Sequence, residues 1–355
     1  QVLNQLKPVI RIVDQRLGGP PEKGKSNFFS KILIDAVHER LEKGEQTILF
    51  LNRRGYARIM LCEACGYEAG CPNCSVPFTY SRQRRQLSCH LCGASKPAPE
   101  KCPSCGSPEI RYTGIGTEKI ESAANAVFGH ARVVRMDSDS MQGDRRNYET
   151  VLERFKRGEI DILIGTQMIA KGLHFPNVTL VGVINADGNL LMPDFRAPER
   201  TFQLLTQVAG RAGRGAVRGE VIIQTYNPDN ETIRFAAEQD FESFRDYDLE
   251  AREILHYPPY SYLIAVHFQG VDEGRVAEFA EGFTARLRPY CVEPVKISGP
   301  SPAPIERIKA KYRYITLIRG NALGRVRHVL REEILRGKTP KDVEVYADVD
   351  AQSLL

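Results

Sequence analysis

The sequence has no signal peptide and no apolar run long enough to cross a bilayer, so it is not typical of a secreted or membrane protein. It also has no internal repeat and no low-complexity tract. Cysteine is scarce outside one segment, because eight of the nine cysteines lie between Cys62 and Cys105. The single remaining thiol, Cys291, fits a reducing compartment, and we expect a cytoplasmic protein. The chain begins with Gln1 instead of Met, from which we expect a fragment or a processed product.

The eight clustered cysteines form four C-x-x-C motifs, which begin at Cys62, Cys71, Cys89 and Cys102. Each motif directs two thiolates to one point, and two motifs make the tetrahedral S4 cage that Zn2+ prefers. Four motifs therefore predict two structural zinc ions per chain. Disulfides are an alternative, but the two cysteines of a motif are too close in sequence to bridge comfortably. An iron–sulfur cluster would favour less regular spacing.

The spacing leaves the pairing of the motifs open. Fourteen residues separate Cys74 from Cys89, which is a comfortable zinc-ribbon loop, so we favour a nested arrangement. The predicted ligands are then Cys62, Cys65, Cys102 and Cys105 for zinc 1, and Cys71, Cys74, Cys89 and Cys92 for zinc 2. Consecutive pairing, of the first motif with the second and of the third with the fourth, is also sterically possible. His90 could replace a thiolate, although eight cysteines suffice.

Strand and helix patterns alternate on both sides of the cysteine segment, which predicts a parallel sheet with helices on both faces. We expect strands at 9–13, 47–51, 110–113, 132–136, 161–164, 179–184 and 220–225. We expect helices at 28–43, 117–128, 145–157 and 199–208. The cysteine segment is then an insertion into this lobe, in which metal replaces a core because large apolar residues are few.

The pattern changes after Pro228. Two polar helical stretches form a connector, and the last residues follow the order strand, helix, strand, strand, helix, strand, which is the ferredoxin-like split motif. Between its central strands we expect a proline-containing loop at 299–312. We therefore predict an α/β lobe at 1–60 and 109–228, a zinc-binding insertion at 61–108, a helical connector at 229–259 and an α+β C-terminal domain at 260–355.

The net charge of +5 is unevenly spread, because Arg307–Lys341 holds eleven Lys and Arg residues against two Glu. Such a basic block predicts an anionic partner, for example nucleic acid. The alternative is a solvated helix face. Lys309, Lys311 and Arg313, interleaved with tyrosines, are suited to contacts with a nucleic-acid backbone and to base stacking.

Two turns carry residues suited to phosphate chemistry. Gly165, Thr166 and Gln167 follow a buried strand, with Lys171 close behind, and backbone N–H groups together with a hydroxyl can hold a phosphate. Gln207 opens a run that ends at Arg214, in which Arg211 and Arg214 can direct two guanidinium groups at one anion, as an arginine finger does.

A third candidate is the stretch Gly19–Ser26, which matches the phosphate-loop pattern letter for letter. The strand before it ends several residues too early, so we interpret the match as accidental. A small NTPase that uses this loop, with Asp187 as the metal-binding acid, remains an alternative.

Four features together resemble the PriA family of bacterial replication-restart helicases. They are the strand from Thr47 that runs into Phe50–Tyr56, the eight-cysteine module, the run Ile164–Gly172 and the run Gln207–Arg214. The resemblance covers essentially the whole chain. It implies the second RecA-like lobe of a helicase with an inserted two-zinc module, followed by the ferredoxin-like C-terminal domain.

The resemblance implies an ATP-dependent 3'-to-5' superfamily 2 DNA helicase that recognises stalled or collapsed forks and D-loops and starts primosome assembly. ATP and Mg2+ would bind between two lobes, and because the first lobe is missing we expect this fragment to be nearly inactive. Arg211 and Arg214 would reach the γ-phosphate, and Gln207 would couple ATP to closure. The residues that would contact nucleic acid or relay the nucleotide state are Arg54, Gly165, Thr166, Gln167, Lys171, Lys309, Lys311 and Arg313.

The expected partners are branched and single-stranded DNA, single-stranded-DNA-binding protein, whose acidic tail the C-terminal domain could hold, and other primosome proteins. We expect a monomer in the bacterial cytoplasm, associated with the nucleoid at forks and not with a membrane. The alternative is a zinc-ribbon nucleic-acid scaffold without motor activity, against which the intact Gln207, Arg211 and Arg214 argue.

Overall fold

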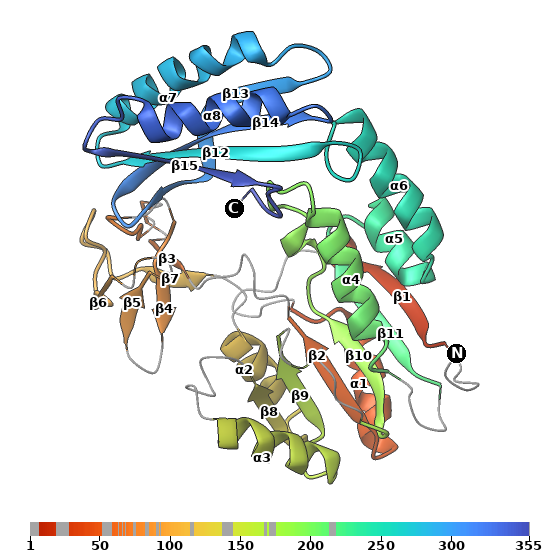
Figure 1. The fold of residues 1–355 in the computed structure, drawn as a ribbon. Coiled ribbons are helices and arrows are strands. Elements are labelled where there is room, and N and C mark those ends of the chain that lie inside the picture. Colours follow the sequence, from red (N-terminus) through yellow and green to blue (C-terminus); the bar gives the residue numbers. More distant parts are fainter. Residues whose placement is uncertain are drawn as a thin grey trace. The chain divides into compact units, whose positions relative to one another are not determined.

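The structure is a computed structural model, and it describes residues 7–18, 28–51, 59–62, 64–65, 67, 69–73, 76–81, 85–89, 92, 94–113, 117–136, 145–166, 169, 175–212 and 218–354. The chain divides into two compact units (Figure 1). The first unit holds residues 1–56, 115–192 and 197–246, and the second holds residues 57–114, 193–196 and 247–355. Within the described ranges, none of the helices has the length and apolar character that crossing a bilayer requires.

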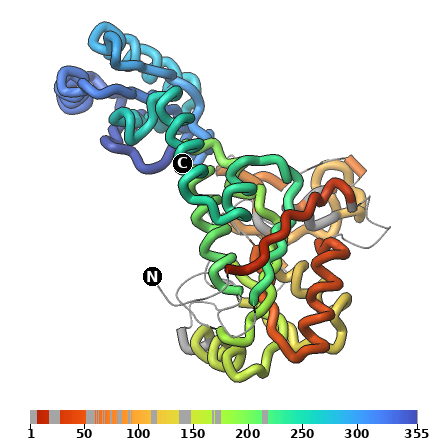
Figure 2. Tube along the Cα trace, turned by 90° about the vertical axis from the view of Figure 1, so that its right-hand side faces the viewer, coloured from red at the N-terminus to blue at the C-terminus, as the bar shows by residue number. Residues whose placement is uncertain are grey.

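The first unit is built on a six-stranded sheet. Its strands lie in the order β1 (Val9–Asp14), β11 (Glu220–Thr225), β10 (Val178–Val183), β2 (Gln46–Phe50), β9 (Ile162–Gly165) and β8 (Val133–Met136). Every neighbouring pair is parallel. β1 runs beside β11, although the two strands are far apart in sequence (Figure 2). All residues of β2, β9 and β10 are buried, which is typical of parallel strands covered on both faces.

Helices cover both faces of this sheet, as the sequence pattern predicts. On one face, α1 (Lys31–Glu42) and α2 (Thr117–Val127) pack against a core that includes Leu49 and Ile164. On the other face, α3 (Arg145–Lys156), α4 (Ala197–Ala209), α5 (Glu231–Glu238) and the start of α6 (Phe241–Ile254) pack on a second core. Two short 3-10 helices, η1 (Gln15–Gly18) and η2 (Asp187–Asn189), follow β1 and β10.

The cysteine segment forms two small antiparallel sheets. β3 (Ile59–Cys62) pairs with β7 (Ile110–Thr113), and β4 (Thr79–Ser81), β5 (Gln86–Ser88) and β6 (Ser95–Pro97) form a three-stranded sheet. The expectation that 110–113 resumes the parallel sheet is therefore wrong. Its apolar residues suit either sheet, and β3, at the other end of the insertion, is its partner.

The C-terminal domain has the predicted order of elements. These are β12 (Tyr262–Gly270), α7 (Glu273–Leu287), β13 (Lys296–Ile308), β14 (Lys311–Gly320), α8 (Gly324–Arg336) and β15 (Val343–Val349), with a 3-10 turn η3 (Arg288–Tyr290) after α7. The antiparallel sheet has the order β13-β14-β12-β15. Both helices pack on one face of it, over a core that includes Phe268, Phe283 and Ile318. This is the ferredoxin-like arrangement.

The expected loop at 299–312 is instead the end of a long hairpin. β13 extends to Ile308 and β14 begins at Lys311, so only Lys309 and Ala310 turn the chain, both with positive φ (51° and 64°). β13 is an edge strand, and an edge strand tolerates proline because one row of its N–H groups needs no partner. The pairing register shifts at 298/301 and 302/307, around the prolines.

Gly165, at the end of β9, has no room for a side chain. A Cβ atom there would lie 2.7 Å from the carbonyl oxygen of Met136 and 2.0 Å from Cδ1 of Ile169. We expect Gly165→Ala to lower the free energy of unfolding by about 1–3 kcal/mol, because the backbone of β8 must shift. Denaturant unfolding followed by circular dichroism measures this. Gly129→Ala is the control, because its Cβ would make only an ordinary contact of 3.7 Å, and an equal loss in both variants would contradict the steric explanation.

Candidate functional site

The structure gathers the described cysteines into two clusters. In the first, the Sγ atoms of Cys62 and Cys105 lie 3.6 Å apart and those of Cys65 and Cys102 lie 3.7 Å apart. In the second, the Sγ atoms of Cys71 and Cys92 lie 3.6 Å apart, with Cys89 beside them. Within each cluster all these sulfur atoms lie within 4.8 Å of one another. The outer motifs are thus grouped together, as are the inner ones, and Cys74 lies outside the described residues.

The sulfur spacing fits a zinc ion. Thiolates bind zinc at about 2.3 Å, so neighbouring corners of a tetrahedral S4 site lie about 3.8 Å apart. A disulfide would bring two sulfurs to about 2.05 Å. Each of the described cysteines is free of a disulfide. A set made only of thiolates closes the coordination sphere, so the site would be structural and would have no open position for chemistry.

The four motifs share one backbone turn. In each, the N–H of the first cysteine donates to a carbonyl oxygen five residues later, and the acceptors are Tyr67, Val76, Ala94 and Ser107. N–H groups also point at sulfur: those of Asn73 and Ser104 lie 3.4 Å from the Sγ atoms of Cys71 and Cys102, and that of Ala94 lies 3.5 Å from Sγ of Cys92. Such turns aim both sulfurs of a motif inward, and the N–H groups favour the thiolate.

The environment of Cys102 illustrates this effect. Burial raises the pKa of its thiol, but the backbone N–H groups of Cys105 and Ser104 lower the pKa to about 7. The thiolate, which is the form that binds metal, is therefore accessible near neutral pH. The only large apolar side chains buried in the described part of this segment are Met60, Phe78 and Leu87. So small a core supports the view that metal stabilises the module.

The first predicted phosphate-binding turn lies at the carboxyl end of β9. Thr166 is buried, and its carbonyl oxygen accepts from the N–H of Ile169 at 3.0 Å. Gly165 accepts from the N–H of Leu51 at 2.9 Å, which ties the turn to the end of β2. Gln167, Lys171 and Arg54 lie outside the described residues.

The second turn ends α4. Its exposed Gln207 lies on the solvent side, while Val208 and Ala209 face the core. The N–H of Arg211 donates to the carbonyl of Val208 at 3.0 Å, which holds Arg211 against the last turn of the helix. Arg214 lies outside the described residues.

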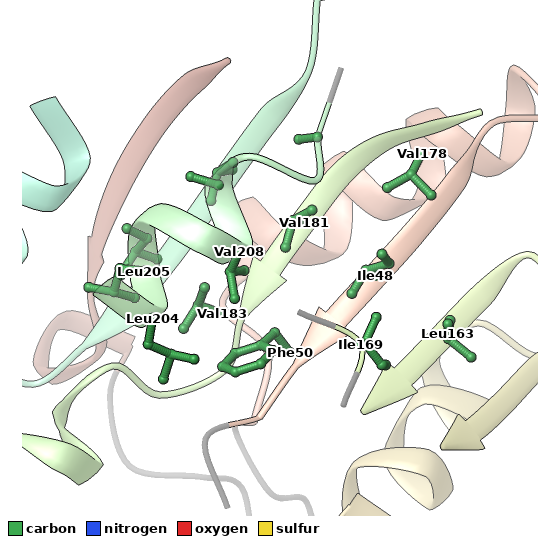
Figure 3. Close-up of a cluster of buried hydrophobic side chains, with 14 of the residues drawn as sticks. Ile48, Phe50, Leu163, Ile169, Val178, Val181, Val183, Leu204, Leu205 and Val208 are labelled. Carbon is green, nitrogen blue, oxygen red and sulfur yellow. The ribbon is translucent and has the colours of Figure 1, made fainter. Parts of the chain in front are cut away.

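Both turns are anchored on the same buried core. Ile169 from the first turn and Val208 and Ala212 from the second belong to one cluster of apolar side chains, which also contains Phe50 and Val181 (Figure 3). The two turns lie at opposite ends of that core. The first turn follows the carboxyl end of β9, whereas α4 starts after the carboxyl end of β10 and runs back to the start of β11, so the second turn lies at the amino end of the parallel strands. The arrangement can therefore serve two ligands, one at each end of the lobe.

The hydrogen bonds of Asp187 indicate a structural role. Its buried carboxylate accepts from Oγ1 of Thr225 at 2.7 Å, from the N–H of Tyr226 at 2.9 Å and from Nδ2 of Asn227 at 3.0 Å. These bonds fix the chain after β11. The arrangement does not favour the alternative in which Asp187 holds a metal ion, and Gly19–Ser26 lies outside the described residues.

The three basic candidates of the C-terminal hairpin, Lys309, Lys311 and Arg313, differ in exposure and in their partners. Lys309 is exposed at the turn, while Lys311 forms an ion pair with Glu344 and thereby lowers the pKa of that carboxyl. Arg313 is buried, and its Nη1 donates to the carbonyl of Ile305 at 3.2 Å. Of the three, Arg313 is therefore the least available to an external ligand.

No sequence pattern pointed to Pro193–Arg196, the segment directly before α4. This segment belongs to the second unit, and Asp194 is buried there. An acidic and an aromatic residue immediately before a helix were the available signal.

Three family models match this chain. They are the helicase conserved C-terminal domain at 113–216, the Cys-rich region domain of PriA DNA helicase at 71–97 and the primosomal protein N C-terminal domain at 253–352. The first of these covers both predicted phosphate-binding turns, and the second covers the inner cysteines.

Curated relatives agree with these matches. The chain is 44% identical over 319 residues to the replication restart protein PriA of Bacillus subtilis, which is 90% of this chain and 39% of the relative. It is 38% identical to the PriA proteins of Synechocystis, over 98% of this chain and 42% of the relative, and of Haemophilus influenzae, over 92% and 45%. The chain thus spans less than half the length of these relatives.

Solved structures give weaker matches. RecG bound to a three-way DNA junction is 14% identical with a TM-score of 0.37, over 70% of this chain and 22% of that chain. The Hef helicase domain of Pyrococcus furiosus is 16% identical with a TM-score of 0.29, over 59% of this chain and 28% of that chain. Neither likeness is close enough to support a conclusion.

We expect two zinc ions per chain. Cys65→Ser should lose one ion and Cys92→Ser the other, and Cys291→Ser, outside both clusters, should keep two. Zinc per chain is measured by mass spectrometry of the purified protein.

The double variant Cys65→Ser/Cys102→Ser tests the grouping. Both residues belong to the first cluster, so one ion should remain. Loss of both ions would contradict the nested grouping, because consecutive pairing puts these two cysteines in different sites.

Proposed function

We propose, from the premise that this chain belongs to the PriA family of replication restart proteins, that it is the C-terminal portion of an ATP-dependent 3'-to-5' DNA helicase. It supplies the second RecA-like lobe, two structural zinc sites and a domain that binds DNA or protein partners. The lobe that binds ATP and Mg2+ belongs to the remainder of the longer protein. The limits we propose are 1–60 and 109–228 for the lobe, 61–108 for the zinc insertion, 229–259 for the connector and 260–355 for the C-terminal domain, except that β3 and β7 at the two ends of the insertion belong with the insertion.

The observation that carries this proposal is the common core beneath the two turns, within the range that matches the helicase C-terminal domain. A rigid core can transmit a displacement from one turn to the other. Arg211 and Arg214 act on the γ-phosphate, where a permanent positive charge stabilises the transition state of phosphoryl transfer. Gln207 couples ATP to lobe closure. Gly165, Thr166, Gln167, Lys171 and Arg54 contact the DNA backbone or relay the nucleotide state.

The motion follows from charge. ATP attracts cationic groups of both lobes and draws the lobes together, and hydrolysis releases them. DNA held across both lobes then moves by one step. In the longer protein this motor acts at stalled or collapsed forks and D-loops, where it starts primosome assembly. Its proposed partners are branched and single-stranded DNA, single-stranded-DNA-binding protein and other primosome proteins, and its proposed location is the cytoplasm, at forks on the nucleoid.

The scaffold alternative differs from the motor in one respect that the chain itself carries. A zinc-ribbon scaffold does not require an arginine such as Arg211 at the end of a helix beside the exposed Gln207. The backbone of Arg211 is held by the last turn of α4, and this arrangement favours the motor.

The chain by itself should hydrolyse ATP about 1,000-fold more slowly than the full-length protein, because an arginine finger without the phosphate-binding lobe has no substrate to stabilise. A coupled phosphate-release assay with and without DNA measures the rate. A rate close to that of the full-length protein, lost in Lys25→Ala, would contradict this proposal and would favour the Gly19–Ser26 loop.

Binding of single-stranded DNA should depend on salt. Lys309→Ala/Lys311→Ala should reduce the slope of log affinity against log salt by up to about 1.4, since each phosphate contact with a single strand contributes about 0.7. Adding Arg313→Ala should change the slope little, because Arg313 is buried. Fluorescence anisotropy at several salt concentrations measures the slope.

Two controls make the test specific. Lys156→Ala, an exposed lysine on α3, should leave the slope unchanged. Glu344→Gln should raise the affinity, because it removes the anion that pairs with Lys311. An unchanged slope in the double variant would exclude the hairpin as the DNA contact.

A further inference from the structure

The tip of the C-terminal hairpin lies against the inner cysteine cluster, and both belong to the second unit. The backbone N–H of Ala310 donates to the carbonyl oxygen of Asn73 at 2.5 Å. Asn73 stands inside an inner C-x-x-C motif, and its own N–H lies 3.4 Å from Sγ of Cys71. The residue that receives the hairpin is therefore part of the turn that holds an inner thiol.

A second contact between the hairpin and this cluster is apolar. The thiols of the inner cluster lie in a small apolar core, here called the inner core, whose buried members are Met60, Ala69, Cys71, Phe78, Leu87 and Cys89. Ile308, directly before the hairpin turn, packs on the inner core. Among the described residues of this core and its neighbours, Ile308 alone comes from outside residues 59–113. The hairpin thus adds an apolar side chain to a core that is otherwise local to the cysteine segment.

The two cysteine clusters differ in exposure. Cys65 and Cys105 of the outer cluster are exposed, whereas Cys71 and Cys89 of the inner cluster are buried. Both contacts of the hairpin tip, the hydrogen bond and the apolar one, involve the inner cluster. The inner cluster is therefore the one that can position the hairpin.

The hairpin tip has few connections to its own sheet. The pairing register of β13 and β14 shifts between Pro302 and Arg307, and beyond the shift two pairs remain, Arg307 with Tyr312 and Ile308 with Lys311. The guanidinium carbon of Arg307 lies 5.3 Å from the centre of the Tyr312 ring. This contact joins the two strands of the tip to each other but does not tie the tip to the rest of the sheet.

The turn itself has a backbone that needs support. Lys309 and Ala310 have φ values of 51° and 64°, and residues other than glycine keep such a conformation where the surrounding contacts fix it. The bond from Ala310 to Asn73 is made by this turn, and the packing of Ile308 lies directly beside it. These contacts therefore fix the direction in which Lys309 points.

We propose that the Cys71 turn positions the hairpin tip, so that the inner zinc site and not the outer one sets the contacts of Lys309 and Lys311 with single-stranded DNA. This inference rests on the proposed DNA contacts of the two lysines. Asn73 and Cys71 lie in one tight turn, so ligands that hold the inner thiols together also fix the carbonyl to which Ala310 donates. The inner core is too small to hold this turn without a bound metal ion.

Hydrogen exchange of the Ala310 amide tests the docking without DNA, in the 355-residue chain. Cys92→Ser removes a ligand of the inner cluster, and the amide should exchange about fivefold faster, which is the protection that one net hydrogen bond provides. Cys65→Ser, in the outer cluster, should leave this exchange unchanged. Mass spectrometry with fragmentation of the peptide that contains Ala310 measures the rate, and the zinc content shows which ion each variant has lost.

The salt dependence of DNA binding tests the consequence. Cys92→Ser should make the slope of log affinity against log salt shallower by up to about 1.4, as Lys309→Ala/Lys311→Ala does, whereas Cys65→Ser should keep the slope of the unaltered chain. Combining Cys92→Ser with the two lysine substitutions should change the slope no further, because the same contacts are lost only once. Fluorescence anisotropy with single-stranded DNA measures these slopes.

A variant that leaves every zinc ligand in place separates docking from metal loss. Ile308→Ala removes the apolar contact and should speed the exchange at Ala310 and make the slope shallower, each by less than Cys92→Ser does, while both zinc ions remain. Ile305→Ala is the matched control, because Ile305 lies on the same strand and the described part of the inner core does not include it. It should leave both measurements unchanged.

The outcomes separate the two proposals. Unchanged exchange at Ala310 or an unchanged slope in Cys92→Ser would overturn the positioning role alone, as would equal changes in Cys65→Ser and Cys92→Ser. An unchanged slope in Lys309→Ala/Lys311→Ala would overturn the proposed DNA contacts, and the positioning role with them. Faster exchange and a shallower slope in Cys92→Ser but not in Cys65→Ser, together with a shallower slope in the lysine variant, is the result that supports both.

Discussion

The antiparallel pairing of β3 with β7 is the constraint on which the organisation of the chain depends. Ile59 lies opposite Thr113 and Cys62 opposite Ile110, so the insertion begins and ends at neighbouring positions. The parallel sheet is therefore continuous across it: β2, before the insertion, pairs with β9 and β10, which follow it. A separately stabilised module is tolerated at a point where its two ends meet. The same pairing brings Cys62 toward the motif of Cys102 and Cys105, and so selects the nested grouping of the thiols.

The parallel sheet and the cysteine module are stabilised by different physical means. In the parallel sheet, strands with continuous apolar residues are covered on both faces, and the free energy comes from burial. In the cysteine module, the backbone turns and the N–H groups around sulfur arrange the thiols in sites that a bound cation would stabilise. The two predicted phosphate-binding turns depend on the first kind of stability, because Ile169 and Val208 anchor them on the core of the parallel sheet.

Much of this organisation could be predicted from the sequence, since buried parallel strands and amphipathic helices leave strong local patterns. The predictions that failed concerned segments whose structure depends on partners remote in the chain. The apolar residues of 110–113 suit either sheet, and only the pairing with β3 decides between them. The prolines of β13 indicate a loop unless the strand is known to be an edge. Motif spacing predicted cysteine clusters but left their grouping open. The burial of Arg313 has no local signal, because its charge and its basic neighbours match those of exposed Lys309.

The pairing of β1 with β11 has a consequence for biosynthesis. Val9 lies opposite Glu220, so β1 has no partner in this sheet until β11, the last of its strands in the sequence, has been translated. Each C-x-x-C turn, by contrast, closes within a few residues of its first cysteine. The nascent chain can therefore acquire its cysteine turns early, whereas the sheet around them closes late. During that interval the backbone N–H and C=O groups of β1 have no partner in this sheet.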